Sequence, residues 1–252
     1  MNFFKKANFL AVSILLGLSS AAQADTIFGI YAGAGTWQQE YTGDVTSNAI
    51  TVDVENDLAL DDTDNNVMYL AVEHPLPFLP NVRAQRIAMD VDGSNVLDRT
   101  IEFNGQTFTV ADQVATTVDL TQTDAVLYYE VLDNVVSLDL GLAISMVEGE
   151  IAVQGSLDSA RAEFDEVIPM LYTKARVDLP FTGLWAAVEG QGVSFQGNSL
   201  MEFNAHIGYE SPIGLGLEAG YRSVQMELDS FEDVQSAELD ISGPYAAVNF
   251  HF

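Results

Sequence analysis

The segment from Asp124 to Val147 constrains the fold more than any other part of the chain, because its apolar residues recur at every second position. They are Ala125, Leu127, Tyr129, Val131, Val136, Leu138, Leu140, Leu142, Ile144 and Met146. A period of two indicates strands with two unlike faces. Asp133-Asn134 interrupts the pattern and suits a two-residue hairpin turn that would pair Leu127 with Leu140. Such a hairpin fits either a soluble sandwich or a barrel in lipid.

The first 24 residues predict an export signal. Lys5 and Lys6 precede an apolar core from Ala7 to Leu18, and Ala22-Gln23-Ala24 has the small-residue pattern of a cleavage site. We therefore expect cleavage after Ala24 and a single domain over residues 25–252. No later apolar run approaches the ~20 residues that a membrane-spanning helix needs.

Composition narrows the class of protein further. The chain has no cysteine, which removes disulfides and thiol chemistry from an exported protein. Loss of Lys5 and Lys6 with the signal leaves seven of the nine basic residues against 37 acidic ones, so the formal charge changes from −28 to −30. Nucleic acid is excluded as a partner, because phosphate binding needs a basic surface. An acidic chain that is 48% hydrophobic and β-patterned is typical of the outer membrane.

Alternating segments along the chain predict an all-β, antiparallel, up-and-down transmembrane barrel with about ten strands, eight or twelve being the alternatives. Gly197-Asn198 reads as another hairpin turn, with Val188 opposite Ile207. Short connections are expected at 75–81, 133–134, 180–183 and 211–214. Long acidic loops are expected after the first strand, between 92 and 115 with a hairpin at Asn104-Gly105, and over 148–166. Short turns belong in the periplasm, so both chain ends should lie there.

The last strand carries a candidate assembly signal. Phe252, Phe250, Val248 and Ala246 share one face, while Asn249 and His251 lie between them. A terminal phenylalanine on an amphipathic strand resembles the segment by which outer-membrane barrels are recognised. We expect Phe250 and Phe252 to contact the barrel assembly machinery.

The predicted faces put a cluster of charged residues inside the barrel. Its members are Arg86, Lys174, Arg176, Arg222, Glu130, Asp139, Glu189, His206 and Glu218. Charges in a narrow lumen must be paired or hydrated. They could form a polar plug or line a narrow, acidic, water-filled path, and the plug is the commoner arrangement in small barrels.

No residue pattern indicates an enzyme. A ten-strand barrel invites comparison with the outer-membrane proteases called omptins, which need His and Asp at the extracellular rim. The only histidines are His74, His206 and His251, and none is expected there. Asp62, Asp64, Asn66 and Glu73 follow part of a calcium-loop spacing, but Val67 replaces the required glycine. We predict no catalytic residues, no metal site and no cofactor.

The segment YYEVLDNVVSLDLGL, preceded by ATTVDLTQTDAVLYY, resembles a family of small Gram-negative outer-membrane proteins distantly similar to outer membrane protein W. The resemblance implies outer-membrane localisation and a barrel, and a channel for small solutes only by analogy. We expect a monomer in contact with membrane lipid and lipopolysaccharide, with a structural or passive-transport role. The alternatives are a surface interaction or adhesion protein that uses its acidic loops and, less favoured, a barrel enzyme.

Overall fold

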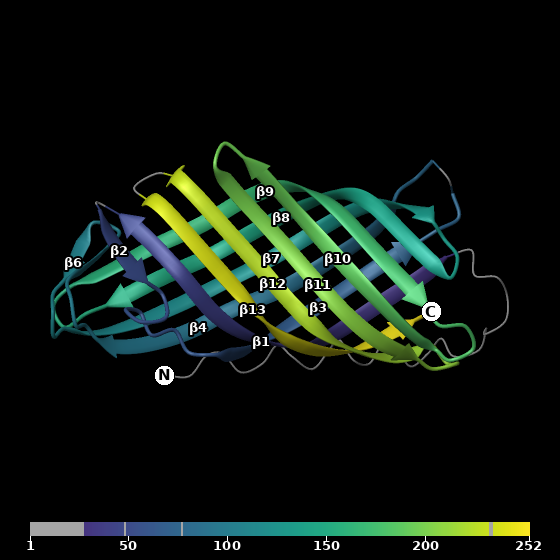
Figure 1. The fold of residues 1–252 in the computed structure, drawn as a ribbon, viewed down its shortest axis with the longest axis horizontal. Helices are drawn as coiled ribbons and strands as arrows, with labels where there is room; N and C mark the ends of the chain where they lie inside the picture. Colours follow the sequence, from purple (N-terminus) through teal and green to yellow (C-terminus); the bar gives the residue numbers. More distant parts are fainter. Residues whose placement is uncertain (1–27, 48, 77, 232–233) are drawn as a thin grey trace, which may run out of the picture.

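A computed structural model describes residues 28–252 except 48, 77 and 232–233, so the predicted export signal lies outside the described residues. Ten antiparallel strands close into a barrel through pairing of the last strand with the first (Figure 1). The ring strands are β1 (Gly29–Ser47), β3 (Thr63–Glu73), β4 (Asn81–Val96), β7 (Gln113–Leu132), β8 (Val136–Gln154), β9 (Ser159–Asp178), β10 (Leu184–Phe195), β11 (Asn198–Glu210), β12 (Leu215–Phe231) and β13 (Val234–His251). The predicted fold class and strand number are confirmed.

Three short strands extend one end of the barrel. β2 (Ile50–Asp53) pairs with the end of β1, and β5 (Ile101–Phe103) pairs with β6 (Gln106–Phe108) in a small separate hairpin. The predicted turn at Asn104-Gly105 joins β5 to β6, and both residues have positive φ. We call this end the head and the opposite end, where β1 begins and β13 finishes, the turn end.

The predicted hairpins exist, but two registers were wrong by two residues. Leu127 pairs with Leu142 rather than Leu140, because a bulge between Glu130 and Leu132 lengthens the β7–β8 connection. Ile207 pairs with Ala186 rather than Val188, because the β10–β11 turn falls at Gln196-Gly197, both with positive φ. A shift of two residues preserves the faces, so the inward and outward assignments on these strands stand.

The acidic loop predicted over 148–166 is also wrong. This segment forms the outer parts of β8 and β9, which are joined by a short connection over 155–158. Likewise β1 continues to Ser47 and β4 to Val96, into segments expected to be loops. The strands are therefore longer than a bilayer requires, and the acids lie on strand surfaces rather than on free loops.

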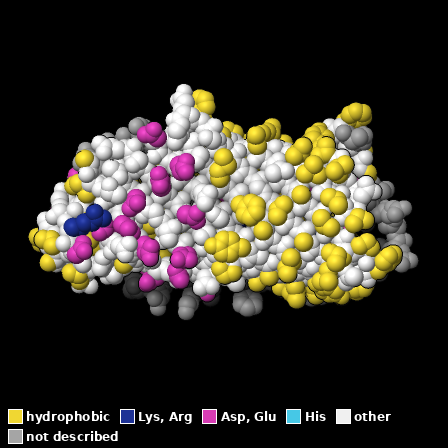
Figure 2. Space-filling view, viewed as in Figure 1, with side chains coloured by type: hydrophobic (Ala, Val, Ile, Leu, Met, Phe, Trp, Pro, Cys, Tyr) yellow, Lys and Arg dark blue, Asp and Glu magenta, His cyan; other side chains and the backbone are white. Residues whose placement is uncertain are grey.

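The outer surface has two zones (Figure 2). On the face shown, hydrophobic side chains cover the half toward the turn end, whereas acidic side chains gather on the half toward the head. On β8 the outward residues are apolar from Val136 to Met146, close to the ~9–11 residues that a tilted strand needs to cross a bilayer, and then change to acids at Glu148. We call the apolar zone the membrane band.

The inner surface shows the reverse pattern. Inside the membrane band many inward residues are polar or charged, whereas inside the head most are apolar. One hydrophobic cluster lies in the head, and the other reaches from the head into the band. The head therefore follows the rule for a soluble protein and the band follows the rule for a protein in lipid. The polarity of every long strand inverts along its length, because its surroundings change from acyl chains to water.

This inversion explains why the interior assignment of Arg86 was wrong. On β4 the inward side chains are Arg83, Gln85, Ile87, Met89 and Val91, and the side chain of Arg86 points outward. An inward Arg86 would require its neighbours Ile87, Met89 and Val91 to face lipid, but these residues lie in the head, where apolar residues face inward. Asp90 lies on the same face of β4 as Arg86 and is also exposed on the outer surface.

Candidate functional site: a polar cavity in the membrane band

A cavity of about 360 Å³ occupies the barrel interior at the level of the membrane band. Its walls come from all ten ring strands, and it reaches Asp133 and Asn134 in the β7–β8 connection and His251 at the end of β13. The cavity therefore extends to the turn end of the barrel. Its volume lies within the range of small-molecule sites.

One row of inward polar residues crosses six neighbouring strands of the wall. Directly paired positions place Glu130 beside Asp139, Asp139 beside Lys174, and Lys174 beside Glu189, and the row continues to Asn204 and Arg222. Each belongs to a different strand, and period-two alternation points them all inward. Five of the nine predicted residues therefore lie in one continuous row across the barrel wall.

The other predicted members lie nearby. His206, Glu218 and Arg176 also line the cavity, so eight of the nine predicted residues do and Arg86 does not. The Arg176 guanidinium binds Asp178 at 2.7 Å and lies 4.5 Å from the centre of the Trp185 ring. His206 packs edge-on against Trp185, with ring centres 5.1 Å apart. No direct ion pair joins Glu189 to His206 among the residues described, because Ala187, not Glu189, is paired with His206.

Arg83 is the main member of the cavity that was not predicted. Its guanidinium lies 3.3 Å from Glu189, donates to Gln85 at 3.1 Å and stacks over the Tyr69 ring at 4.6 Å. It was not among the residues expected inside, although β4 begins at Asn81 and places Arg83 on its inward face. The sequence does contain a pattern that predicts an inward Arg83: the polar residues Asn81, Arg83 and Gln85 alternate with Val82 and Ala84.

Above this row, toward the head, buried amides and carboxyl groups close the cavity. Asp124 is 1% exposed and accepts hydrogen bonds from Gln85 at 3.1 Å and Gln191 at 2.9 Å. Gln122 bonds both Asp124 and Glu202, and Arg222 pairs with Glu202 at 3.3 Å. We call this layer, made of Gln85, Gln122, Asp124, Gln191, Glu202 and Arg222, the amide layer. Most hydrogen bonds of these side chains are made to one another, so few of their polar groups remain for a solute.

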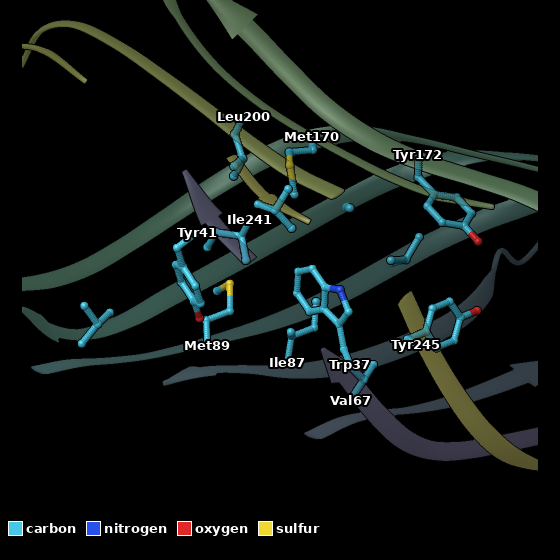
Figure 3. Packing of buried hydrophobic residues seen from close by; sticks show 14 of the residues in the cluster. Trp37, Tyr41, Val67, Ile87, Met89, Met170, Tyr172, Leu200, Ile241 and Tyr245 are labelled. Atoms are coloured by element: carbon cyan, nitrogen blue, oxygen red, sulfur yellow. The ribbon is translucent and has the colours of Figure 1, made fainter. Parts of the chain in front are cut away.

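Beyond the amide layer, closely packed apolar side chains fill the barrel (Figure 3). Trp37 and Ile87 are 0% exposed, and Tyr41, Met89, Met170, Leu200 and Ile241 converge on the same space from other strands. A second cluster in the head contains Ile101 and Phe108 of the β5–β6 hairpin. The first cluster also includes Tyr128, Tyr172 and Tyr245, which line the cavity. Its members on the head side of the amide layer, together with the second cluster, form what we call the apolar plug. The passage is polar for only part of its length.

The predicted assembly residues lie at the closing seam. Phe250 is paired with Ala32 of β1, and the amide of Phe252 donates to the Ile30 carbonyl at 2.9 Å. Their rings stack with centres 6.5 Å apart. Contact with an assembly machinery stays a prediction.

The described ranges offer little else as a conventional site. His74 and His251 lie at the turn end and His206 lines the cavity, so the histidines are remote from the head. Within residues 28–252, less the four undescribed positions, no group of three or more His, Asp or Glu side chains is placed to hold a metal ion. The same residues include no helix long and apolar enough to span a membrane.

The architecture is that of the barrels found in Gram-negative outer membranes. The outer membrane protease OmpT from Escherichia coli superimposes with a TM-score of 0.57 at 9% identity, covering 93% of this chain and 99% of that one. The translocator domain of the autotransporter NalP from Neisseria meningitidis gives 0.46 at 11% identity, covering 89% and 88%, and Ail, the attachment invasion locus protein of Yersinia pestis, gives 0.37 at 9%, covering 89% and 98%.

No family model matches the chain, and no curated protein sequence matches it. The resemblance to Gram-negative outer-membrane barrels that the sequence indicated is confirmed at the level of the fold. At 9% identity the likeness to OmpT carries the fold alone.

Proposed function

We propose that this protein is a non-conducting outer-membrane barrel that anchors a folded, acidic head above the membrane surface. The observation that carries the proposal is the apolar plug, in which Trp37 and Ile87 are completely buried across the bore. Ions and polar solutes would have to cross this close-packed apolar region without hydration, which is energetically costly. Of the roles expected from the sequence, the structural one is therefore favoured over passive transport.

The membrane band and the acidic head support an orientation with the turn end in the periplasm. The two long connections, between β1 and β3 and between β4 and β7, lie at the head, and β1 begins and β13 finishes at the turn end, as in outer-membrane barrels generally. Arg86 faces outward and is paired with Thr123 of β7, which is paired with Met146 of β8. Met146 lies two residues before Glu148, the first outward acid on β8. At that level its guanidinium would meet lipid or lipopolysaccharide headgroups, whose phosphates it can bind.

Conductance across planar bilayers tests the proposal. We expect wild-type protein to stay silent over many insertions, while a general porin conducts in the same membranes. A double variant that empties part of the plug, W37A/M89A, provides the positive control for this chain, provided that it still forms a barrel. Stable, single-sized conductance steps from wild-type protein would overturn the proposal.

A second role, attachment to a cationic surface partner, is favoured by the arrangement of the acids. Paired positions on four neighbouring strands place Asp90, Asp119, Glu150 and Glu163 in one row, all on the outer face of the head. Arg161 pairs with Glu150 at 3.1 Å, while Asp90 and Asp119 stand directly opposite one another, an arrangement of like charges that is destabilising. Their combined field would attract a positively charged partner.

Binding to a polylysine surface at increasing salt tests this second role. We expect D90N/D119N/E150Q/E163Q to bind more weakly than wild type and to show a shallower salt dependence. A variant with the same number of charges removed from the cavity, E73Q/E130Q/D139N/E218Q, should bind like wild type. Equal losses in both variants would show that only net charge matters and would exclude the row as a binding surface.

A further inference from the structure

We infer that the periplasmic cavity is a binding site for a small organic cation, held by Asp139 against the paired rings of Tyr128 and Tyr172. The inference concerns the cavity below the amide layer. It does not depend on whether the barrel conducts, but it does take the turn end to be periplasmic.

The charge of the lining favours a cation. Eight lining residues are acidic, namely Glu73, Glu130, Asp133, Asp139, Asp178, Glu189, Glu210 and Glu218, and four are basic, namely Arg83, Lys174, Arg176 and Arg222. Three of the four bases already have carboxylate partners, in the pairs Arg83–Glu189, Arg176–Asp178 and Arg222–Glu202. An excess of negative charge in a confined, low-dielectric space attracts cations strongly.

Asp139 is the carboxylate that is left incomplete. It is 3% exposed, and its Oδ1 atom is buried without a hydrogen-bond partner among the described residues. Lys174 is paired with it on β9, yet no ion pair within 4.0 Å joins the two in the described part of the chain. A buried, unsatisfied carboxylate oxygen is costly, and a bound cation would remove that cost.

Two aromatic rings stand beside this carboxylate. Gly141, two residues beyond Asp139 on the same face of β8, is paired with Tyr128 on one side and Tyr172 on the other. Because glycine places no side chain between them, the two rings approach to 5.8 Å at an angle of 51°. A carboxylate next to tilted aromatic faces is the chemistry that recognises substituted ammonium groups.

The rest of the cavity shows that its rings accept cations. The guanidinium groups of Arg83 and Arg176 lie 4.6 Å and 4.5 Å from the ring centres of Tyr69 and Trp185. No guanidinium is so placed over Tyr128 or Tyr172 among the residues described. The Tyr128 hydroxyl donates to Glu73 at 2.7 Å, which fixes its ring and adds a second carboxylate near the site.

Choline is a suitable probe, because its neutral isostere 3,3-dimethylbutan-1-ol has the same shape without the charge. Isothermal titration calorimetry of the mature protein, residues 25–252, in detergent micelles should show saturable choline binding at millimolar or lower concentration. The alcohol should not bind. The choline methyl protons should also shift upfield in proton NMR, because they would lie over tyrosine rings.

Variants separate the proposed site from the general negative charge of the protein. D139N should weaken choline binding about tenfold, equivalent to about 1.4 kcal/mol. Asp90→Asn, the same change on the outer surface of the head, should leave it unchanged. Y172L removes one ring and tests the site if D139N fails to form a heat-modifiable barrel on gels.

Absence of choline binding up to roughly 10 mM, a range that corresponds to negligible affinity, would overturn the inference. So would equal binding of the neutral alcohol, or equal weakening by D139N and Asp90→Asn. The choline test does not depend on the conductance experiment. Conductance would contradict the non-conducting barrel, and absence of choline binding would contradict the cation site.

Discussion

At the scale of single residues, position along the barrel axis decides what an inward side chain does. Trp37 and Trp185 are both inward and nearly buried, but Trp37 lies in the apolar plug and Trp185 borders the polar cavity. The Trp37 indole also donates to the Gly243 carbonyl at 3.2 Å. A guanidinium lies over each ring, Arg222 at 5.7 Å from the centre of Trp37 and Arg176 at 4.5 Å from that of Trp185, so the two sites differ in the apolar packing around Trp37 and in the open cavity beside Trp185.

Replacing Trp37 with alanine should destabilise the protein more than the same change at Trp185. A fully buried tryptophan typically contributes about 3–5 kcal/mol when truncated, because a cavity remains. At Trp185, water from the adjacent cavity can fill the space. Urea unfolding of both variants in detergent, followed by tryptophan fluorescence, measures the difference, and equal losses would contradict the assignment of Trp37 to a dry plug.

Acid should weaken the head through Asp53. Hydrogen bonds from the Asn56 side chain and backbone hold the pKa of Asp53 below its usual range. Since the folded pKa is lowered, this contribution is present above the unfolded value of about 3.9 and is lost as the pH falls through it toward the folded pKa.

The change in stability between pH 7 and about pH 3, measured by urea unfolding, should therefore be smaller in D53N than in wild type. Asp62→Asn, an exposed acid in the same connection, controls for the loss of one charge. An identical pH dependence in wild type and D53N would show that Asp53 does not contribute to the loss of stability in acid.

At the scale of elements, β8 shows how one strand serves two environments. Its outward face is apolar up to Met146 and acidic from Glu148, while its inward face passes from Asp139 to Val153 in the head cluster. Gly149 lies just beyond this change, with a φ of 152° and the Asp119 carbonyl oxygen 1.9 Å from where a Cβ would lie. Glycine is required here by both conformation and space.

Gly149→Ala should therefore cost much more stability than Gly105→Ala in the β5–β6 turn. Gly105 also has a positive φ, of 75°, but no atom lies within 4 Å of an added Cβ. We expect about 1–2 kcal/mol for the backbone conformation alone at Gly105 and at least twice that at Gly149, where β7 must also move. Comparable unfolding free energies for the two variants would show that β7 and β8 accommodate the methyl group.

At the scale of the whole molecule, the barrel combines two solvents along one axis. The acidic surface and apolar interior of the head mirror the apolar surface and polar interior of the membrane band (Figure 2). The boundary between the two zones fixes how deeply the molecule sits in a bilayer, because neither zone is stable in the other's surroundings.

A charge placed on the membrane band should cost far more than the same charge on the head. Leu142, 64% exposed at the middle of the band, and Leu157, 94% exposed in the β8–β9 connection, form a matched pair. L142R should destabilise the lipid-embedded protein by about 2–4 kcal/mol, whereas L157R should have little effect. Unfolding in lipid vesicles measures both, and a neutral L142R would place the bilayer elsewhere on the barrel.

The sequence by itself determined the strands, their alternation and the closed barrel, because these depend on local periodicity. The faces of β13 followed directly, and eight of the nine residues predicted for the interior line the cavity. Register was less accessible, since a bulge near Val131 and the turn at Gln196-Gly197 each moved pairing by two residues.

Only the tertiary structure decided where lipid ends and water begins. Period-two alternation tells which residues share a face but not whether that face is inside or outside. Ile87, Met89 and Val91 face a dry interior for the same physical reason that Leu138, Leu140 and Leu142 face lipid: each set avoids water. Arg86 was misplaced because that choice depends on the height of β4 relative to its neighbours, which is fixed by pairing around the whole ring.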